Sequence, residues 1–172
     1  MPFSIFREGG YVDSRRSGIS EGIKAVRGRF RKSALEEGSV QSTSILLSDD
    51  NSAVLDQVGK ILQREKRYKV VAAISDGRTV VREYFRLAPD IVILDISMGK
   101  VSGIDIAREL RDSGCHAKII FLTVHEDSDY VNAGMGAGGS AYVVKSRLSQ
   151  DLLCAIKAVL SNKLFVSPSL LY

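Results

Sequence analysis

The sequence predicts a three-layer α/β domain whose core is a parallel β-sheet. From residue 45 onward, short runs rich in β-branched residues alternate with stretches of helical periodicity, which is the pattern of repeated strand–helix units. Residues 91–94 form an uninterrupted apolar run, IVIL, as expected for a strand that is buried on both faces. Right-handed crossovers between five such units favour the flavodoxin-like strand order 2-1-3-4-5.

Five strands and five helices account for the predicted domain, residues 45–162. The expected strands are Ile45–Asp49, Tyr68–Ile74, Ile91–Asp95, Lys118–Thr123 and Ala141–Val144. The expected helices are Ser52–Glu65, Arg78–Leu87, Ile104–Arg111, Asp129–Ala137 and Leu148–Leu160. Apolar residues three and four positions apart indicate each helix, and the fourth is the weakest because glycines crowd its end.

The segments on either side of the domain have a different character. Residues 1–44 carry eight Lys/Arg and five Asp/Glu, a net charge of +3, and we expect this N-terminal extension to be disordered or partly helical at Ile19–Phe30. A basic docking arm and translation from an upstream start codon are alternative explanations of the same segment. Residues 163–172 form a tail that resembles the start of an interdomain linker.

Composition and charge exclude several classes of protein. Hydrophobic residues at 45% and charged residues at 26% are ordinary for a globular protein, and no apolar run is long enough to cross a bilayer. The first residues lack the apolar core of a secretory signal, and two distant cysteines form no framework, so we expect a cytoplasmic protein. The nearly neutral core, at +1 over residues 45–172, argues against nucleic-acid binding.

Functional side chains are expected where the central strands end, because ligands bind beyond the carboxyl ends of the strands in sheets of this kind. Asp49 and Asp50 end the first strand and Asp95 ends the third, so three carboxylates converge and need a cation such as Mg²⁺ to neutralise them. Thr123 and Lys145 end the fourth and fifth strands. Together these groups suit phosphoryl transfer to Asp95, since a carboxylate can act as a nucleophile.

Four blocks of sequence resemble those of response-regulator receiver domains of two-component systems. The blocks are Leu46–Asn51, Val92–Met98, Phe121–Thr123 and Tyr142–Lys145. The resemblance implies that Asp95 accepts a phosphoryl group from a histidine kinase. It also implies a Mg²⁺ site, whose ligands are Asp49, Asp50, Asp95 and the backbone carbonyl of Ser97.

The same resemblance implies a conformational switch. Thr123 and Lys145 contact the phosphoryl oxygens, and Tyr142 is the aromatic residue that turns inward when Thr123 moves. The face built from the fourth helix, fifth strand and fifth helix then controls a partner or an output domain. A homodimer through that face, or through the first and fifth helices, is a further expectation, and direct nucleic-acid binding by this chain is not expected.

Some details place the chain nearer to one subgroup and others depart from the family. Asp127–Val131 and Phe165–Pro168 are similar to NarL/LuxR-like receivers, which precede a helix-turn-helix domain, but only a few residues follow the fifth helix. We therefore expect a stand-alone or a truncated receiver that lacks the output domain. Gly99 stands where the family has proline, which predicts a looser loop, and Val124 is bulkier than usual.

Three alternatives compete with a phosphorylated receiver that is no enzyme beyond its own phosphorylation and dephosphorylation. The first is a pseudo-receiver, an interaction module that works without phosphorylation. The second is a haloacid-dehalogenase-type phosphatase, but Ser97 stands where such enzymes carry a second aspartate. The third is a dinucleotide-binding domain, which the lack of a GxGxxG motif after the first strand disfavours.

Overall fold

The computed structural model describes residues 42–170, and all statements below concern that part of the chain. The expectations for residues 1–41, including a helix at Ile19–Phe30, lie outside the described residues. No helix among residues 42–170 combines the length and apolar character that spanning a bilayer would need.

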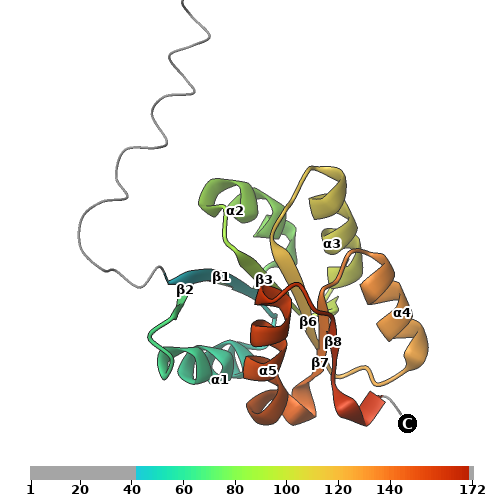
Figure 1. The fold of residues 1–172 in the computed structure, drawn as a ribbon. Helices are drawn as coiled ribbons and strands as arrows, with labels where there is room; N and C mark the ends of the chain where they lie inside the picture. Colours follow the sequence, from blue (N-terminus) through green and yellow to red (C-terminus); the bar gives the residue numbers. More distant parts are fainter. Residues whose placement is uncertain (1–41, 171–172) are drawn as a thin grey trace, which may run out of the picture. The chain divides into compact units, whose positions relative to one another are not determined.

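A single parallel sheet forms the centre of the domain (Figure 1). Its strands are β1 Thr43–Ser48, β2 Tyr68–Ile74, β3 Ile91–Leu94, β6 Lys118–Thr123, β7 Ala141–Val144 and β8 Phe165–Val166. The strand order is β2-β1-β3-β6-β7-β8, so the predicted flavodoxin-like order of five strands is confirmed. The prediction of five strands is corrected to six, because two residues of the C-terminal tail add a short edge strand.

Strand β8 is held to β7 by more than its two paired residues. Tyr142 is the register partner of Val166, and the backbone N–H of Ser167 donates to the carbonyl of Tyr142 at 2.9 Å. The buried Ser167 hydroxyl accepts a hydrogen bond from the backbone N–H of Val144 at 3.1 Å. The segment that follows the last helix is therefore built into the sheet.

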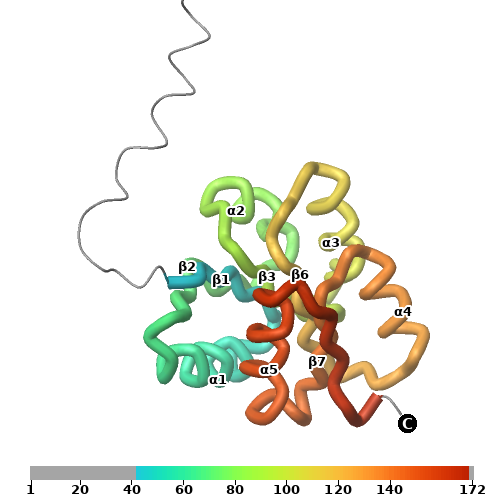
Figure 2. The backbone as a smooth tube through the Cα atoms, in the orientation of Figure 1, coloured from blue at the N-terminus to red at the C-terminus, as the bar shows by residue number. Residues whose placement is uncertain are grey.

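Five helices cover the two faces of the sheet. They are α1 Ser52–Gln63, α2 Val80–Leu87, α3 Gly103–Asp112, α4 Ser128–Gly136 and α5 Leu148–Leu160. Helices α1 and α5 lie on one face and α2, α3 and α4 on the other, as the backbone trace shows (Figure 2). Short 3-10 turns complete the fold at Gly77–Thr79, Lys145–Arg147 and Pro168–Leu170.

The second helix begins two residues later than predicted. The Asp76 carboxylate accepts a hydrogen bond from the backbone N–H of Arg78 and caps a 3-10 turn, so the α-helix starts only at Val80. The last helix, in contrast, spans the residues that its apolar periodicity predicts.

Alternating strand residues divide the core between the two faces. Leu46, Val92 and Phe121 point toward α2, α3 and α4, whereas Leu47 and Ile93 point toward α1 and α5. All five are at most 1% exposed, so the central strands are buried on both faces as their apolar sequence predicts. Their carboxyl ends are thereby fixed against a rigid core.

Arg111 on α3 connects the far ends of two helices. Its guanidinium donates to the carbonyls of Cys115 and Ala117, at 2.8 and 2.9 Å, and to the carbonyl of Gly138 at 2.8 Å. These bonds tie the exit of α3 to the exit of α4. Because Gly138 has a φ of +91° and lies against the Arg111 side chain, a glycine is required there.

Candidate functional site: an acidic cluster at the carboxyl edge of the sheet

Two buried carboxylates lie side by side because β1 and β3 are neighbours. Ser48 pairs with Leu94, and Asp49 and Asp95 follow directly at the ends of these strands. Asp49 is fully buried and Asp95 is 3% exposed, whereas Asp50 is exposed. Each of the three offers a carboxylate oxygen within 4.8 Å of the others. The structure thus brings together the three aspartates that the sequence singled out.

Lys145 supplies a positive charge to this cluster. It follows β7 directly, and its Nζ lies 2.7 Å from Oδ2 of Asp49 and 3.2 Å from Oδ2 of Asp95. Burial nevertheless raises the pKa of the Asp95 carboxyl, against the opposing effect of Lys145, and the charge of Asp49 raises it further. One ammonium does not compensate all the negative charge, so the cluster has room for another cation.

One oxygen of Asp95 has no hydrogen-bond donor among the described residues. Its Oδ1 is buried, while Oδ2 faces Lys145. A buried carboxylate oxygen without a donor is costly unless a ligand satisfies it. The two buried carboxylates and the exposed carboxylate of Asp50 form an all-oxygen donor set, which fits a hard divalent cation such as Mg²⁺.

The segment after Asp95 is a tight hairpin and not the loose loop that Gly99 suggested. Strands β4 Ser97–Met98 and β5 Val101–Ser102 pair antiparallel across a two-residue turn at Gly99 and Lys100. Gly99 has a φ of +60°, which glycine adopts readily at the first position of such a turn. The expectation of a looser loop was wrong, because the glycine closes a turn.

Gly103 fixes the hairpin against Asp95. Its backbone N–H donates to the carbonyl of Ile96 at 2.8 Å, and a Cβ at this position would lie only 1.9 Å from the carbonyl oxygen of Asp95. The first turn of α3 therefore touches the backbone of Asp95 itself. This contact was not apparent from the sequence.

Thr123 and Tyr142 lie on the neighbouring strands β6 and β7. The fully buried Thr123 ends β6, and its hydroxyl accepts a hydrogen bond from the backbone N–H of His125 at 3.1 Å. Tyr142 is also fully buried and points inward, with its hydroxyl donating to the carbonyl of His125 at 3.0 Å. Burial raises the pKa of Tyr142 to about 12.

His125 is a site residue that sequence reasoning missed. Its Nε2 lies 2.7 Å from the hydroxyl of Ser97, and its ring stacks on Tyr130 of α4 with 4.0 Å between centroids. The only signal in the sequence is its position, two residues after Thr123 and beyond the strand end. Val124, the residue that is bulkier than usual for the family, is 65% exposed.

Glycines near the end of α4 reflect the packing of Phe121. A Cβ at Gly134 would lie 3.1 Å from the Phe121 ring, and one at Gly139 would lie 2.8 Å from it. The helix nevertheless forms over Ser128–Gly136, within a residue of its predicted bounds. Its glycines allow close approach to β6.

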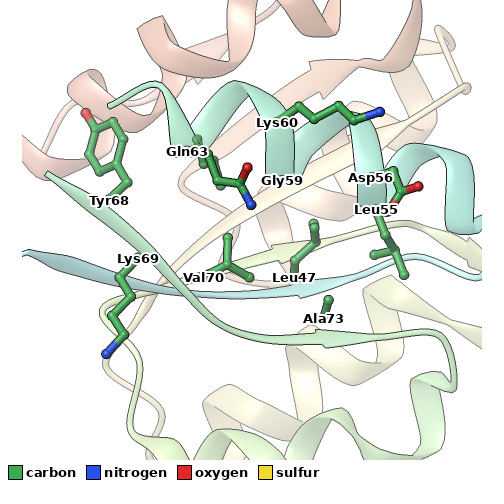
Figure 3. Close-up of a pocket in the computed structure, with 11 residues that line it drawn as sticks. Leu47, Leu55, Asp56, Gly59, Lys60, Gln63, Tyr68, Lys69, Val70 and Ala73 are labelled. Carbon is green, nitrogen blue, oxygen red and sulfur yellow. The ribbon is translucent and has the colours of Figure 1, made fainter. Parts of the chain in front are cut away.

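A separate groove of about 560 Å³ lies between α1 and the edge strand β2 (Figure 3). Leu47, Leu55 and Val70 line it between the helix and the strands, and Lys60 and Lys69 are also among its lining residues. None of the residues that line it belongs to the acidic cluster.

Comparison with known proteins gives the family. The family model of the response regulator receiver domain matches residues 45–157. The transcriptional regulatory protein DesR of Bacillus subtilis is 33% identical over 128 residues, which are 74% of this chain and 63% of DesR. The response regulator UvrY of Escherichia coli is 32% identical over 124 residues, covering 72% of this chain and 57% of UvrY. The chain thus spans less than two thirds of the length of these relatives.

Solved structures show the same fold. A two-component response regulator of the LuxR family from Aurantimonas matches with a TM-score of 0.72 and 32% identity, over 76% of this chain and 93% of that one. The isolated receiver domain of RcsB from Salmonella enterica matches with a TM-score of 0.70, at 23% identity, over 75% and 96% of the two chains. With matching sequence blocks, fold and relatives, this chain belongs to the response-regulator receiver-domain family of two-component systems, and its relatives include regulators of the LuxR family.

Proposed function

We propose that Asp95 accepts a phosphoryl group from a histidine kinase in a Mg²⁺-dependent reaction, and that this charge switches the face formed by α4, β7 and α5. The observation that carries the proposal is the Oδ1 atom of Asp95. It is buried, lacks a donor among the described residues, and belongs to a cluster whose carboxylate oxygens lie within 4.8 Å of one another. A carboxylate oxygen whose lone pairs no hydrogen bond engages can act as the nucleophile toward phosphorus.

The transfer balances without any further reactant. Oδ1 of Asp95 forms a bond to phosphorus while the bond from phosphorus to the kinase histidine nitrogen breaks, and that nitrogen keeps the electron pair. Hydrolysis reverses the modification when water attacks the phosphorus, which releases inorganic phosphate and the free carboxylate. We propose no other substrate, so the chain acts only on its own aspartate.

The ligands proposed for Mg²⁺ are Asp49, Asp50, Asp95 and the backbone carbonyl of Ser97. When bound, the ion supplies positive charge that offsets the carboxylates and the phosphoryl oxygens. Lys145 now contacts both Asp49 and Asp95. Once the charge of Asp49 is neutralised, the Lys145 ammonium can contact the phosphoryl oxygens. Thr123, at the end of β6, donates a hydrogen bond from its hydroxyl to the same oxygens.

The proposed switch acts through Thr123 and Tyr142. Phosphorylation adds a charge of about −1.5 to −2 next to Thr123. Tyr142 already points inward in the free chain, so the proposed change is a shift of populations in which Thr123 moves toward the phosphoryl group while Tyr142 stays buried. The surface so stabilised binds a partner, an output domain or a second copy of the chain, through the α4-β7-α5 face or through α1 and α5.

Intact mass spectrometry after incubation with phosphoramidate and Mg²⁺ tests the proposal. The wild type should gain one phosphoryl group, and chelation of Mg²⁺ or the Asp95→Asn substitution should abolish the gain. Asp105→Asn is a matched control, because Asp105 is exposed on α3 and pairs with Arg108 away from the cluster. A wild type that gains no phosphate and ignores Mg²⁺ would instead be a pseudo-receiver, and the proposal would be wrong.

A further inference from the structure

His125 is a single point of contact between four parts of the domain. Its backbone N–H binds the hydroxyl of Thr123, and its carbonyl accepts from Tyr142. Its ring forms a hydrogen bond with the Ser97 hydroxyl, in the hairpin that follows Asp95, and stacks on Tyr130 in the first turn of α4. Both of the switch residues and both of the flanking segments therefore meet at one residue.

The ring contacts bridge the segments on either side of the acceptor. The Ser97 hydroxyl and Nε2 of His125 are 2.7 Å apart although they are 28 positions apart in sequence. The rings of His125 and Tyr130 are nearly parallel, with an interplanar angle of 10°. Tyr130 is 41% exposed, so this stack is not a forced consequence of core packing. The chain Ser97–His125–Tyr130 joins the acceptor hairpin to α4.

The backbone contact gives this chain a way to sense the acceptor. The Thr123 hydroxyl has its oxygen engaged by the N–H of His125 at 3.1 Å. Movement of Thr123 toward a phosphoryl group on Asp95 pulls on that bond, and the imidazole follows its own backbone. Neither ring contact survives a displacement of a few ångströms, since hydrogen bonds and stacking are short-ranged.

We propose that His125 is a positioning residue, a latch that holds α4 to the acceptor hairpin in the unphosphorylated chain and opens when Asp95 is phosphorylated. This inference rests on the proposed function. The closed latch restrains the hairpin and slows loading of Asp95, and its opening releases the first turn of α4. The route from Ser97 to Tyr130 is distinct from the route through the Tyr142 side chain, although both include His125.

The proton NMR signals of the imidazole rings report the latch directly. The chain contains two histidines, His116 and His125, and a His116→Gln variant assigns them. In the free wild type, stacking on Tyr130 should shift the His125 ring protons upfield, and Tyr130→Leu should remove this shift. Mg²⁺ with beryllofluoride, a phosphoryl mimic, should move them to the unstacked position. Asp95→Asn should not respond.

The rate at which phosphoramidate phosphorylates Asp95, called loading below, provides the second measurement. Ser97→Ala and Tyr130→Leu each remove one ring contact and should load about fivefold faster than the wild type, the factor that one ordinary hydrogen bond contributes to an equilibrium. Tyr130→Phe keeps the stack and should load at the wild-type rate. Ser128→Ala, an exposed serine at the start of α4, is the matched control for Ser97→Ala.

The outcomes separate the latch from the proposed function. If Asp95 loads normally but the His125 signals stay upfield with beryllofluoride, or if both variants load at the wild-type rate, the latch is refuted and phosphorylation stands. If the wild type takes up neither phosphoryl group nor beryllofluoride, both proposals fail. Loss of the upfield shift together with faster loading in the two variants supports the latch.

Discussion

Substitution of Gly103 by alanine tests how the first turn of α3 positions Asp95. The added Cβ would lie 1.9 Å from the carbonyl oxygen of Asp95 and 2.9 Å from its carbonyl carbon. A methyl group packs at about 3.5 Å from its neighbours, so the oxygen must retreat by roughly 1.5 Å. Gly103 has no positive φ, so the clash is the main cost of the substitution.

The substitution should lower both the thermal stability of the domain and the rate at which Asp95 is phosphorylated. Overpacking against backbone costs about 3 kcal/mol, at the upper end of the usual range, because backbone atoms cannot rotate away as a side chain can. For a chain of this size that cost lowers Tm by roughly 6–12 °C. Displacement of Asp95, the proposed phosphoryl acceptor, by more than 1 Å should slow its phosphorylation by about 100-fold. Thermal unfolding followed by circular dichroism and initial rates with phosphoramidate measure the two effects.

Gly59→Ala is the matched control. Gly59 lies within α1, and a Cβ there would meet no heavy atom within 4 Å. Alanine in a helix interior is favoured over glycine by about 1 kcal/mol, so this variant should be slightly more stable and load normally. If Gly103→Ala unfolds at the wild-type temperature and loads at the wild-type rate, the reasoning about this contact is refuted.

Three further substitutions probe the surroundings of the site. Tyr142→Phe removes the hydrogen bond to the His125 carbonyl and should cost about 1 kcal/mol, and spectroscopic titration should lose the tyrosine whose pKa is about 12. Folding raises the pKa of the Asp95 carboxyl above its usual 3.8, so loss of its proton costs stability in the folded protein. The free energy of unfolding of the wild type, measured in urea, should therefore fall relative to that of Asp95→Asn as pH rises from 3.8 through the raised pKa. A constant difference between about pH 3 and pH 8 would contradict this. Arg111→Met leaves three carbonyls without their donor and should lower the free energy of unfolding by about 3 kcal/mol. An unchanged denaturation midpoint would show that these hydrogen bonds do not contribute to stability.

The elements that sequence predicted well are those whose signal is local and long. The last helix was predicted over Leu148–Leu160 because its apolar residues repeat through three turns, and Lys118–Thr123 was predicted because a buried strand reads as a continuous apolar run. Strands of two residues, such as β8, carry no such pattern. They form because a distant partner supplies their hydrogen bonds, which the sequence does not display.

The same distinction applies to the site. Asp49, Asp95 and Lys145 could be placed together because strand order and strand ends follow from the fold class. The contact of Gly103 with Asp95 and the bond between Ser97 and His125 depend on how two loops pass each other. Turn geometry sets that path, so neither contact could be derived from residue types and spacing.

The pairing of β8 with β7 has a mechanical consequence. Val166 lies in register with Tyr142, and Ser167 bonds the backbone on either side of Val143. Because these contacts include backbone hydrogen bonds, a tilt or slide of β7 would move the segment after α5 with it. The backbone that follows α5 is thus coupled mechanically to the strand that carries Tyr142.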